Sequence, residues 1–402
     1  MNSLRKYFSP ENLIKTGLIV YVATASVSIS GQVAGMLIAL VGWIIGIITK
    51  KKLIWTDISK ETKNFIGLIL IFLAVFFVSS IFSKVPLKSF DRLRLILGEM
   101  AFFFVVLNVI DRKFLKKLIV ILVVSTTIES AYGIVQYFTG LNILRDPEVI
   151  PFFRVKGTLS HWNKLGSMLG MIIPLTVAVI FYSEKKLRYI LAVILMSVCL
   201  CFTFTRGGWM AAGFAVVLIA LLKEKKLFYI LGIVFILLLV FKPSRNRIID
   251  TFSITEGDYR RILMWKTSLR MIKDRPFLGQ GPNTFQELFY REYLTEETKP
   301  IFYNEEHGYS HPHNVYLGIT ADMGITGFLA FMALLVYLFY MTARTFSTTT
   351  DVFFRTISLG ILGSLSALAV NGLVDYTFSA EPVYLFWFLA GIIFSIRNKK
   401  ML

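Results

Sequence analysis

Long apolar runs recur along the chain and alternate with short polar segments. Because a bilayer core of about 30 Å needs about 20 apolar residues per helix, this pattern predicts an all-α, polytopic membrane protein with about 12 transmembrane helices. We expect these helices at residues 13–30, 32–49, 65–83, 93–110, 116–138, 163–182, 187–205, 208–222, 227–241, 313–341, 354–374 and 383–396. The chain then divides into residues 1–241 with helices 1–9, residues 242–312 as one large loop, and residues 313–402 with helices 10–12.

Basic clusters occur in every second loop, which orients the predicted helices. They lie at residues 50–52, 112–117, 185–188, 223–226 and 397–400. Lysine and arginine are retained on the cytoplasmic side of membrane proteins. We therefore expect both termini in the cytoplasm and the 242–312 loop on the outer side.

Composition narrows the function class. Apolar residues make up 55% of the chain and charged residues only 17%, whereas soluble domains are about 25% charged, so a soluble enzyme is excluded. The formal net charge of +18 follows from the basic loops and indicates no nucleic-acid partner, while membrane lipids are expected partners. Cys199 and Cys201 lie in one apolar run and suggest neither disulfides nor a metal site.

The large loop contains one amphipathic segment. Residues 259–274 place Ile262, Trp265, Leu269 and Ile272 at helical spacing, and Pro276 ends the pattern. We expect this apolar face to lie on the membrane surface or on the helical bundle.

All four histidines fall on the predicted outer side: His161, His307, His311 and His313. One interpretation is a general base, since histidine titrates near neutral pH. A second is a zinc site, for which His-x-His alone is a weak signal. The third is a polar loop with incidental histidines, and residue type alone leaves the three open.

Arginines could hold an anion on the same side. Arg206 precedes two glycines that permit a sharp turn with accessible amide groups. Arg260 and Arg261 open the amphipathic helix, whose N-terminus would add positive charge. Guanidinium groups suit diphosphate because they stay charged and bond bidentately. Interfacial anchoring of the membrane protein is the alternative.

Carboxylates are less informative. Asp375 follows helix 11 and could orient a histidine, pair with an arginine or lie in solvent. Glu99, Glu129 and Asp322 fall in or near predicted helices, where carboxylates suit a proton-coupled transporter as well as an enzyme. A transporter also predicts paired repeats and charges along a midplane path, whereas the polar clusters here gather at the outer interface.

These motifs together resemble the bacterial O-antigen ligase and polymerase family. The most specific one is His313-Asn314 followed, after nine residues, by Gly324-Ile325-Thr326-Gly327, which is similar to the ligase signature. Other matching positions are Arg206, Arg261, the segment 154–163 that starts at Arg154, the segment 276–285, and Asp375.

The resemblance implies an O-antigen ligase of the bacterial inner membrane. Such an enzyme transfers a glycan from undecaprenyl diphosphate to a lipid A core sugar hydroxyl at the periplasmic face, with inversion and without a metal or other cofactor. His313 would be the catalytic base, and Arg206 and Arg261 would bind the diphosphate. Supporting residues would be Asn314, Asp375, Arg154, Arg260 and His311, with the shares of His307 and His311 left open. The alternative is an O-antigen polymerase or a protein O-oligosaccharyltransferase with the same donor.

Overall fold

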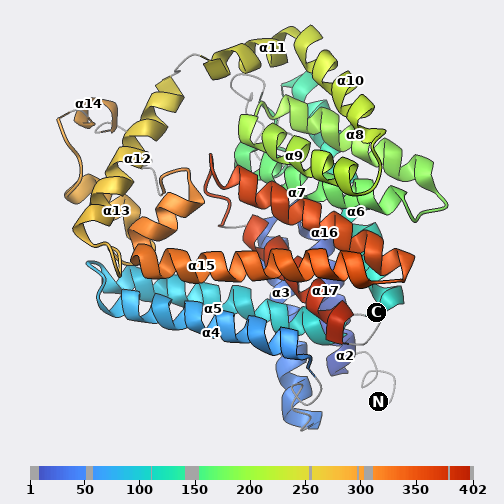
Figure 1. Cartoon of the computed structure of the whole chain (residues 1–402), viewed down its shortest axis with the longest axis horizontal. Coiled ribbons are helices and arrows are strands. Elements are labelled where there is room, and N and C mark those ends of the chain that lie inside the picture. The colour runs from blue at the N-terminus through green and yellow to red at the C-terminus, as the bar shows by residue number, and fades with distance from the viewer. Residues whose placement is uncertain are drawn as a thin grey trace.

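The computed structural model describes residues 9–50, 58–109, 111–140, 154–252, 256–296, 298–302, 311–378 and 381–398. Every regular element in these ranges is a helix (Figure 1). The elements are α2 (Pro10–Thr24), α3 (Ile29–Lys50), α4 (Lys60–Ile81), α5 (Pro86–Val109), α6 (Arg112–Thr139), α7 (Trp162–Ile180), α8 (Lys186–Phe202), α9 (Arg206–Leu222), α10 (Leu227–Val240), α11 (Lys242–Ile249), η2 (Asp250–Phe252), α12 (Glu256–Asp274), α13 (Phe285–Arg291), α14 (Lys299–Phe302), α15 (Val315–Thr348), α16 (Val352–Asn371) and α17 (Glu381–Asn398).

Each of the twelve segments expected to cross the membrane coincides with one helix, α2 to α10 and α15 to α17. Among the described residues, six helices are long and apolar enough to span a bilayer: α3, α4, α6, α7, α15 and α16. The pair α10 and α11, bent by 94°, adds a seventh if it forms one span. The chain is therefore a multi-pass membrane protein, and the number twelve stays a prediction.

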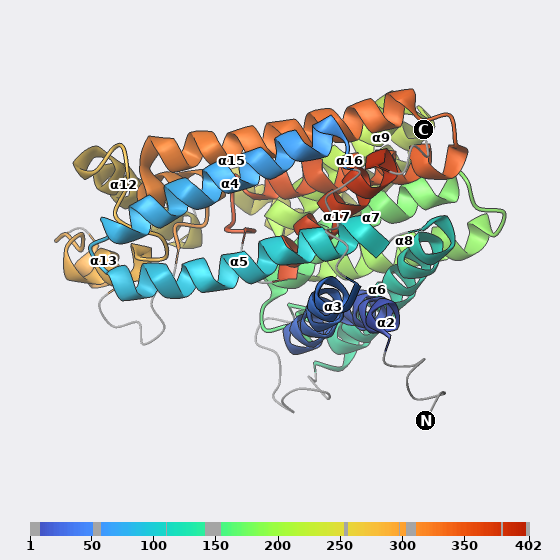
Figure 2. The ribbon, with the colours of Figure 1, turned by 90° about the horizontal axis from the view of Figure 1, so that it is seen from below.

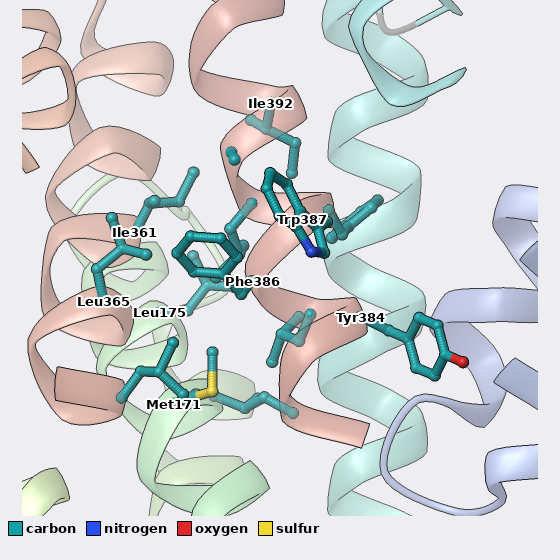
Figure 3. Close-up of a cluster of buried hydrophobic side chains, with 14 of the residues drawn as sticks. Met171, Leu175, Ile361, Leu365, Tyr384, Phe386, Trp387 and Ile392 are labelled. Carbon is teal, nitrogen blue, oxygen red and sulfur yellow. The ribbon is translucent and has the colours of Figure 1, made fainter. Parts of the chain in front are cut away.

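Two apolar helices differ sharply in their surroundings. The side chains of α17 are buried from Glu381 to Arg397, against α5, α7, α15 and α16. Figure 3 shows Phe386 of α17 beside residues of α7 and α16, while Trp387 lies on the side of α17 that faces α5. No residue of α10 is buried, although it consists almost wholly of apolar side chains. A helix that is apolar all round needs a core or lipid around it, so α17 forms the protein core and α10 suits contact with lipid.

Helices α12, α13 and α14 form a helical lobe at one end of the molecule, opposite the C-terminal mark in Figure 1, whereas α11 lies beside α10. The second view shows α12 and α13 at the same end of α15, beside α4 and α5 (Figure 2). The lobe has a small core of its own, to which Leu263, Met264, Met271, Phe285 and Phe289 contribute. The large loop expected between helices 9 and 10 is thus a folded structure.

The amphipathic helix differs from its prediction in start and in face. Helix α12 begins at Glu256, and its buried apolar residues are Leu263, Met264 and Met271. Leu269, expected on the apolar face, is 56% exposed. The expected face is correct at Ile272, which packs partly buried against the lobe core, and wrong at Leu269. The packing of α12 against α13 and α15 turns the buried side toward Leu263, Met264 and Met271.

The turn 276–281 fastens this lobe to α15 through the backbone. Helix α15 is interrupted at Gly324, where φ is +67°, a conformation costly for residues with a Cβ. There the Ile325 N–H donates to Pro276 (2.8 Å), and the Gln280 N–H donates to Ala321 (2.9 Å). A Cβ on Gly324 would collide with the Phe277 carbonyl. The first glycine of the ligase-like signature therefore lets the lobe and the helix meet.

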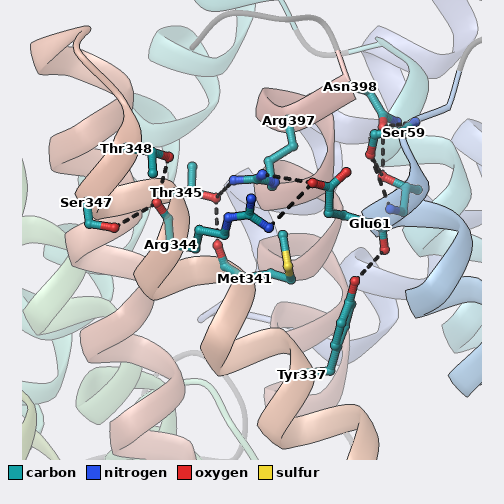
Figure 4. A network of polar contacts seen from close by, with 11 residues as sticks. Ser59, Glu61, Tyr337, Met341, Arg344, Thr345, Ser347, Thr348, Arg397 and Asn398 are labelled. Atoms are coloured by element: carbon teal, nitrogen blue, oxygen red, sulfur yellow. Dashed lines mark hydrogen bonds and ion pairs between the residues drawn. The ribbon is translucent and has the colours of Figure 1, made fainter.

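A polar network ties α4, α15 and α17 together away from the lobe (Figure 4). Arg397, whose side chain is 6% exposed, donates to Glu61 at 3.3 Å, and Arg344 lies 3.6 Å from the same carboxylate. The Asn398 Oδ1 accepts from Thr62 Oγ1 at 2.7 Å, and the Tyr337 hydroxyl donates to the Glu61 carbonyl at 3.0 Å. Arg397, which the sequence places in a basic tail, thus pairs its buried guanidinium with a partly exposed carboxylate.

Candidate active site

Two strained residues turn into one cavity. Phe204 and His313 have φ of +50° and +49°, values uncommon for residues other than glycine. Each precedes the N-cap residue of a helix, Thr205 for α9 and Asn314 for α15. Both line a cavity of about 480 Å³ between α7, α9, α12 and the start of α15. Such strain often marks functional sites.

His313 is held by a carboxylate from another helix end. Its Nδ1 lies 2.9 Å from Oδ1 of Asp375, in the loop after α16. Although burial opposes ionisation, the hydrogen bond and positive charge of His313 hold the pKa of Asp375 below its usual range. An ionised Asp375 accepts the Nδ1 proton, so in the neutral ring Nε2 carries the lone pair of a base.

Asn314 joins the two segments that carry this pair. Its Oδ1 accepts from the Leu317 N–H at 2.9 Å, which caps α15. Its Nδ2 donates to the Leu373 carbonyl at 2.9 Å, two residues before Asp375. The Val315 N–H donates to the Gly372 carbonyl at 2.8 Å. Asn314 therefore sets the position of His313 relative to Asp375 through the backbone.

Five arginines line the same cavity, which we call the arginine-rich cavity: Arg154, Arg206, Arg247, Arg260 and Arg261. Arg206 pairs with Asp258 and donates to the Asp250 carbonyl at 3.4 Å. Arg261 forms no ion pair with any residue that the structure describes. Since the acidic lining residues are Asp258 and Asp375 alone, the described cavity wall carries an excess of positive charge suited to an anion.

The first turn of α9 also faces this cavity. Gly207 and Gly208 line it beside Arg206, and Thr205 makes no side-chain capping bond. Uncapped first-turn amides attract anions. The glycines serve close packing, because Cβ atoms there would meet Asn371 and the Gly166 carbonyl. They lie within the helix and do not form the separate turn expected from the sequence.

Arg154 and His161 form the wall nearest α7. The Arg154 guanidinium lies 4.3 Å from the Trp162 ring and donates to the carbonyls of Thr203 (3.1 Å) and Phe204 (3.2 Å). Burial and the neighbouring arginines lower the pKa of Arg154 to about 9, so it remains a cation at neutral pH. The His161 Nδ1 accepts from the Asn163 N–H at 3.1 Å and caps α7. Burial lowers the pKa of His161 to about 4.

His311 contacts His313 from outside this cavity. Its ring stacks on Tyr376 at 4.8 Å and meets His313 edge-on at 4.7 Å. Burial, together with the charge of His313, lowers the pKa of His311 to about 4, so it is neutral near pH 7. His311 does not line the arginine-rich cavity. His307 lies outside the described residues.

The expected site residues otherwise lie together. Arg154, Arg206, Arg260, Arg261, His313 and Asp375 all line one cavity, and Asn314 supports it. Since α12 begins at Glu256, Arg260 and Arg261 lie beyond its first turn and its N-terminus adds nothing at their position. Among the described residues, no three histidine, cysteine or acidic side chains gather as metal ligands.

The sequence reading missed three residues of the site. Arg247 donates to the Phe204 carbonyl at 3.3 Å, and Asp258 pairs with Arg206. Trp265 Nε1 donates to the Pro312 carbonyl at 2.9 Å, which holds the segment between His311 and His313. The only available signal for Asp258 was its place in the sequence Glu256-Gly257-Asp258, shortly before two arginines. Trp265 was assigned to an apolar face, and nothing in the sequence marked Arg247.

The three carboxylates that fall in or near predicted transmembrane helices are each bonded to a neighbour. Glu99 pairs with Arg92 at 2.7 Å, Glu129 accepts from the Thr158 N–H at 2.6 Å, and Asp322 accepts from the Asn283 N–H at 3.1 Å. They are held by separate helices and loops, which gives no support to a transporter path.

Residues 191–332 match the family model of the O-antigen ligase. This match covers about a third of the chain, from α8 into α15, and includes Arg206, Arg261, His313, Asn314 and Gly324. No curated protein matches the chain at a significant level. Residues 191–332, which carry most of the cavity-lining arginines and His313, are therefore similar to the O-antigen ligase domain.

Proposed function

We propose that the protein is an O-antigen ligase of the bacterial inner membrane. It transfers a glycan from undecaprenyl diphosphate to a sugar hydroxyl of the lipid A core at the periplasmic face, with both termini in the cytoplasm. The observation that carries this proposal is the pairing of His313 with Asp375 at 2.9 Å beside five arginines in one cavity. The family match over residues 191–332 supports the donor class.

The chemistry requires one proton acceptor and one anion site. Nε2 of His313 takes the proton of the attacking hydroxyl, whose oxygen forms a bond to the anomeric carbon. The bond from that carbon to the diphosphate oxygen breaks, with inversion, and undecaprenyl diphosphate leaves with the electron pair. Its growing negative charge is stabilised by Arg206 and Arg261 and by the first-turn amides of α9. In this scheme the arginines replace a divalent cation.

Arg154 and Arg260 extend the positive surface around the diphosphate, while Asn314 and Asp375 position the base. The resemblance of His313-Asn314 and Gly324 to the ligase signature favours the ligase over the polymerase. A polymerase or a protein O-oligosaccharyltransferase uses the same donor chemistry with a different acceptor.

Reconstituted protein tests this function directly. It is supplied with undecaprenyl-diphosphate-linked glycan and with either lipid A core or a second carrier-linked unit. A glycosylated core without chain growth is the expected result, and His313→Ala serves as the inactive control that still binds donor. Longer carrier-linked chains without core modification would identify a polymerase. Transfer to neither acceptor, or near-normal transfer by His313→Ala, would contradict the proposed function or mechanism.

A further inference from the structure

A second cavity, of about 320 Å³, lies on the other side of the segment that holds His311 and His313. It shares no lining residue with the arginine-rich cavity, but residues that are neighbours in the sequence line different cavities. Asn163 lines the first and Lys164 the second; His313 lines the first and Pro312 the second. In the same way, Asp375 lines the first cavity and Tyr376 lines the second. A thin wall of three chain segments therefore separates the two cavities.

The charges of the second cavity do not suit a diphosphate. Arg92, which lines it, forms a two-pronged pair with Glu99, at 2.7 and 3.3 Å. Lys164 lies 3.4 Å from Glu381, whose side chain is 2% exposed. Both cations are thus neutralised by buried carboxylates, and Asp322 adds a further carboxylate to the wall. A dianionic group would meet no excess positive charge here.

The remaining walls suit a sugar. Phe72, Phe76, Phe285, Tyr376 and Phe378 line the cavity, and flat aromatic faces pack well against the C–H faces of pyranose rings. The polar positions are few, as in small-molecule sites. Asp322 accepts from the Asn283 backbone, and Nδ1 of His311 is buried with no hydrogen-bond partner among the described residues. A bound hydroxyl would supply that partner, and the depressed pKa keeps the imidazole neutral for this contact.

We propose that this second cavity binds the acceptor glycan, with the donor diphosphate in the arginine-rich cavity and His313 between them. The inference rests on the proposed function, because it assigns one substrate to each side of the base. The ring centroids of His311 and His313 are 4.7 Å apart, so a sugar hydroxyl held beside His311 would lie one ring away from His313. Asp322 and the aromatic walls would then select the acceptor.

Binding without turnover tests the assignment separately from the function. The ligands are a lipid A core oligosaccharide freed of its acyl chains, a repeat-unit oligosaccharide freed of its carrier, and inorganic diphosphate. Phe76→Ala removes an aromatic wall that is 4% exposed, and Phe77→Ala removes its neighbour on α4, which is 48% exposed and outside the cavity. Asp322→Asn keeps the side-chain volume should Phe76→Ala fold poorly. Arg206→Ala serves as the donor-side variant.

We expect Phe76→Ala or Asp322→Asn to weaken binding of one oligosaccharide about tenfold and to leave diphosphate binding unchanged. Phe77→Ala should bind each of the three ligands as the wild type does, and Arg206→Ala should lose the binding of diphosphate alone. In transfer assays the same two cavity variants should raise the acceptor KM and leave the donor KM unchanged. The proposal is overturned if the wild type binds neither oligosaccharide, if Arg206→Ala abolishes oligosaccharide binding, or if the cavity variants bind normally. Oligosaccharide binding that follows this pattern without transfer by the wild type would refute the proposed function and support the cavity as a glycan site.

Discussion

The Nδ1 atom of His313 lies 2.9 Å from the Oδ1 atom of Asp375, across the gap between the start of α15 and the loop after α16. The two residues are 62 positions apart in the chain. Their contact depends on the backbone strain at His313 and on the bond from Asn314 to the Leu373 carbonyl. This pair makes Nδ1 of the histidine a donor, and in the proposed mechanism Nε2 accepts the proton of the attacking hydroxyl.

Asp375→Asn should damage transfer with little effect on donor binding. The amide can donate to Nδ1, which would favour the tautomer with its proton on Nε2, where the base lone pair is needed. We expect kcat to fall by about 10²–10⁴-fold in the reconstituted transfer assay. An unchanged kcat would show that Asp375 does not set the tautomer of His313.

Arg206→Lys should be a poor enzyme although it keeps the charge. A lysine ammonium cannot form the two-pronged contact of a guanidinium with phosphate, so we expect kcat/KM to fall about tenfold to a hundredfold. Arg245→Lys is the matched control, because Arg245 is exposed on α11 and does not line the cavity. Equal activity of both variants would mean that charge alone suffices at position 206.

The buried histidines predict a loss of stability in mild acid. Burial lowers the pKa of His161 and of His311 from 6.5 to about 4. Between these values the unfolded chain binds more protons than the folded protein, so the free energy of unfolding falls as the pH falls from 6.5 toward 4. The pKa of Asp375 is lowered from its ordinary value of 3.8, so this group changes the free energy of unfolding only at a pH below the range in which the histidines act.

His161→Asn should reduce this pH dependence, because asparagine removes the titrating group and still caps α7. Thermal unfolding in detergent between pH 4 and pH 7 measures the effect. A slope of Tm against pH that is the same in the variant and the wild type would show that His161 does not contribute.

Gly324→Ala should destabilise the junction between the lobe and α15. With φ +67° and ψ −169°, Gly324 lies in a backbone region essentially restricted to glycine, where a residue with a Cβ costs about 1–3 kcal/mol. The added Cβ would also collide with the Phe277 carbonyl. Gly67→Ala is the control, since a Cβ there meets nothing within 4 Å. We expect a clearly lower Tm for Gly324→Ala and no loss for Gly67→Ala; equal Tm values would contradict the role of the kink.

Glu61→Ala should destabilise the protein by about 3 kcal/mol, because it leaves the buried guanidinium of Arg397 without its carboxylate. Glu11→Ala offers a comparison, as its pair with Lys15 is exposed and should contribute at most about 0.5 kcal/mol. Denaturation of both variants in the same detergent decides the point. A small effect of Glu61→Ala would mean that solvent reaches Arg397 in place of Glu61.

Much of the fold followed from local patterns. Apolar runs predicted the twelve helical segments because burial in lipid or core demands long apolar helices with internal backbone hydrogen bonds. The spacing of His313, Asn314 and Gly324 indicated the family, and residue chemistry indicated arginines for a diphosphate. The helices and the motif could be predicted because each depends on residues that are close together in the sequence.

Side-chain partnership between distant segments needed the tertiary structure. Asp258 meets Arg206, Trp265 meets the Pro312 carbonyl, and Arg247 enters the cavity, although neither charge nor spacing pointed to these contacts. The buried face of α12 likewise depended on where α13 and α15 approach it. The tertiary structure also decides that His311 and His313 line different cavities. The positive φ of His313 and the stacking of His311 on Tyr376 set the direction of each ring. Neither feature is encoded in the linear pattern of residues.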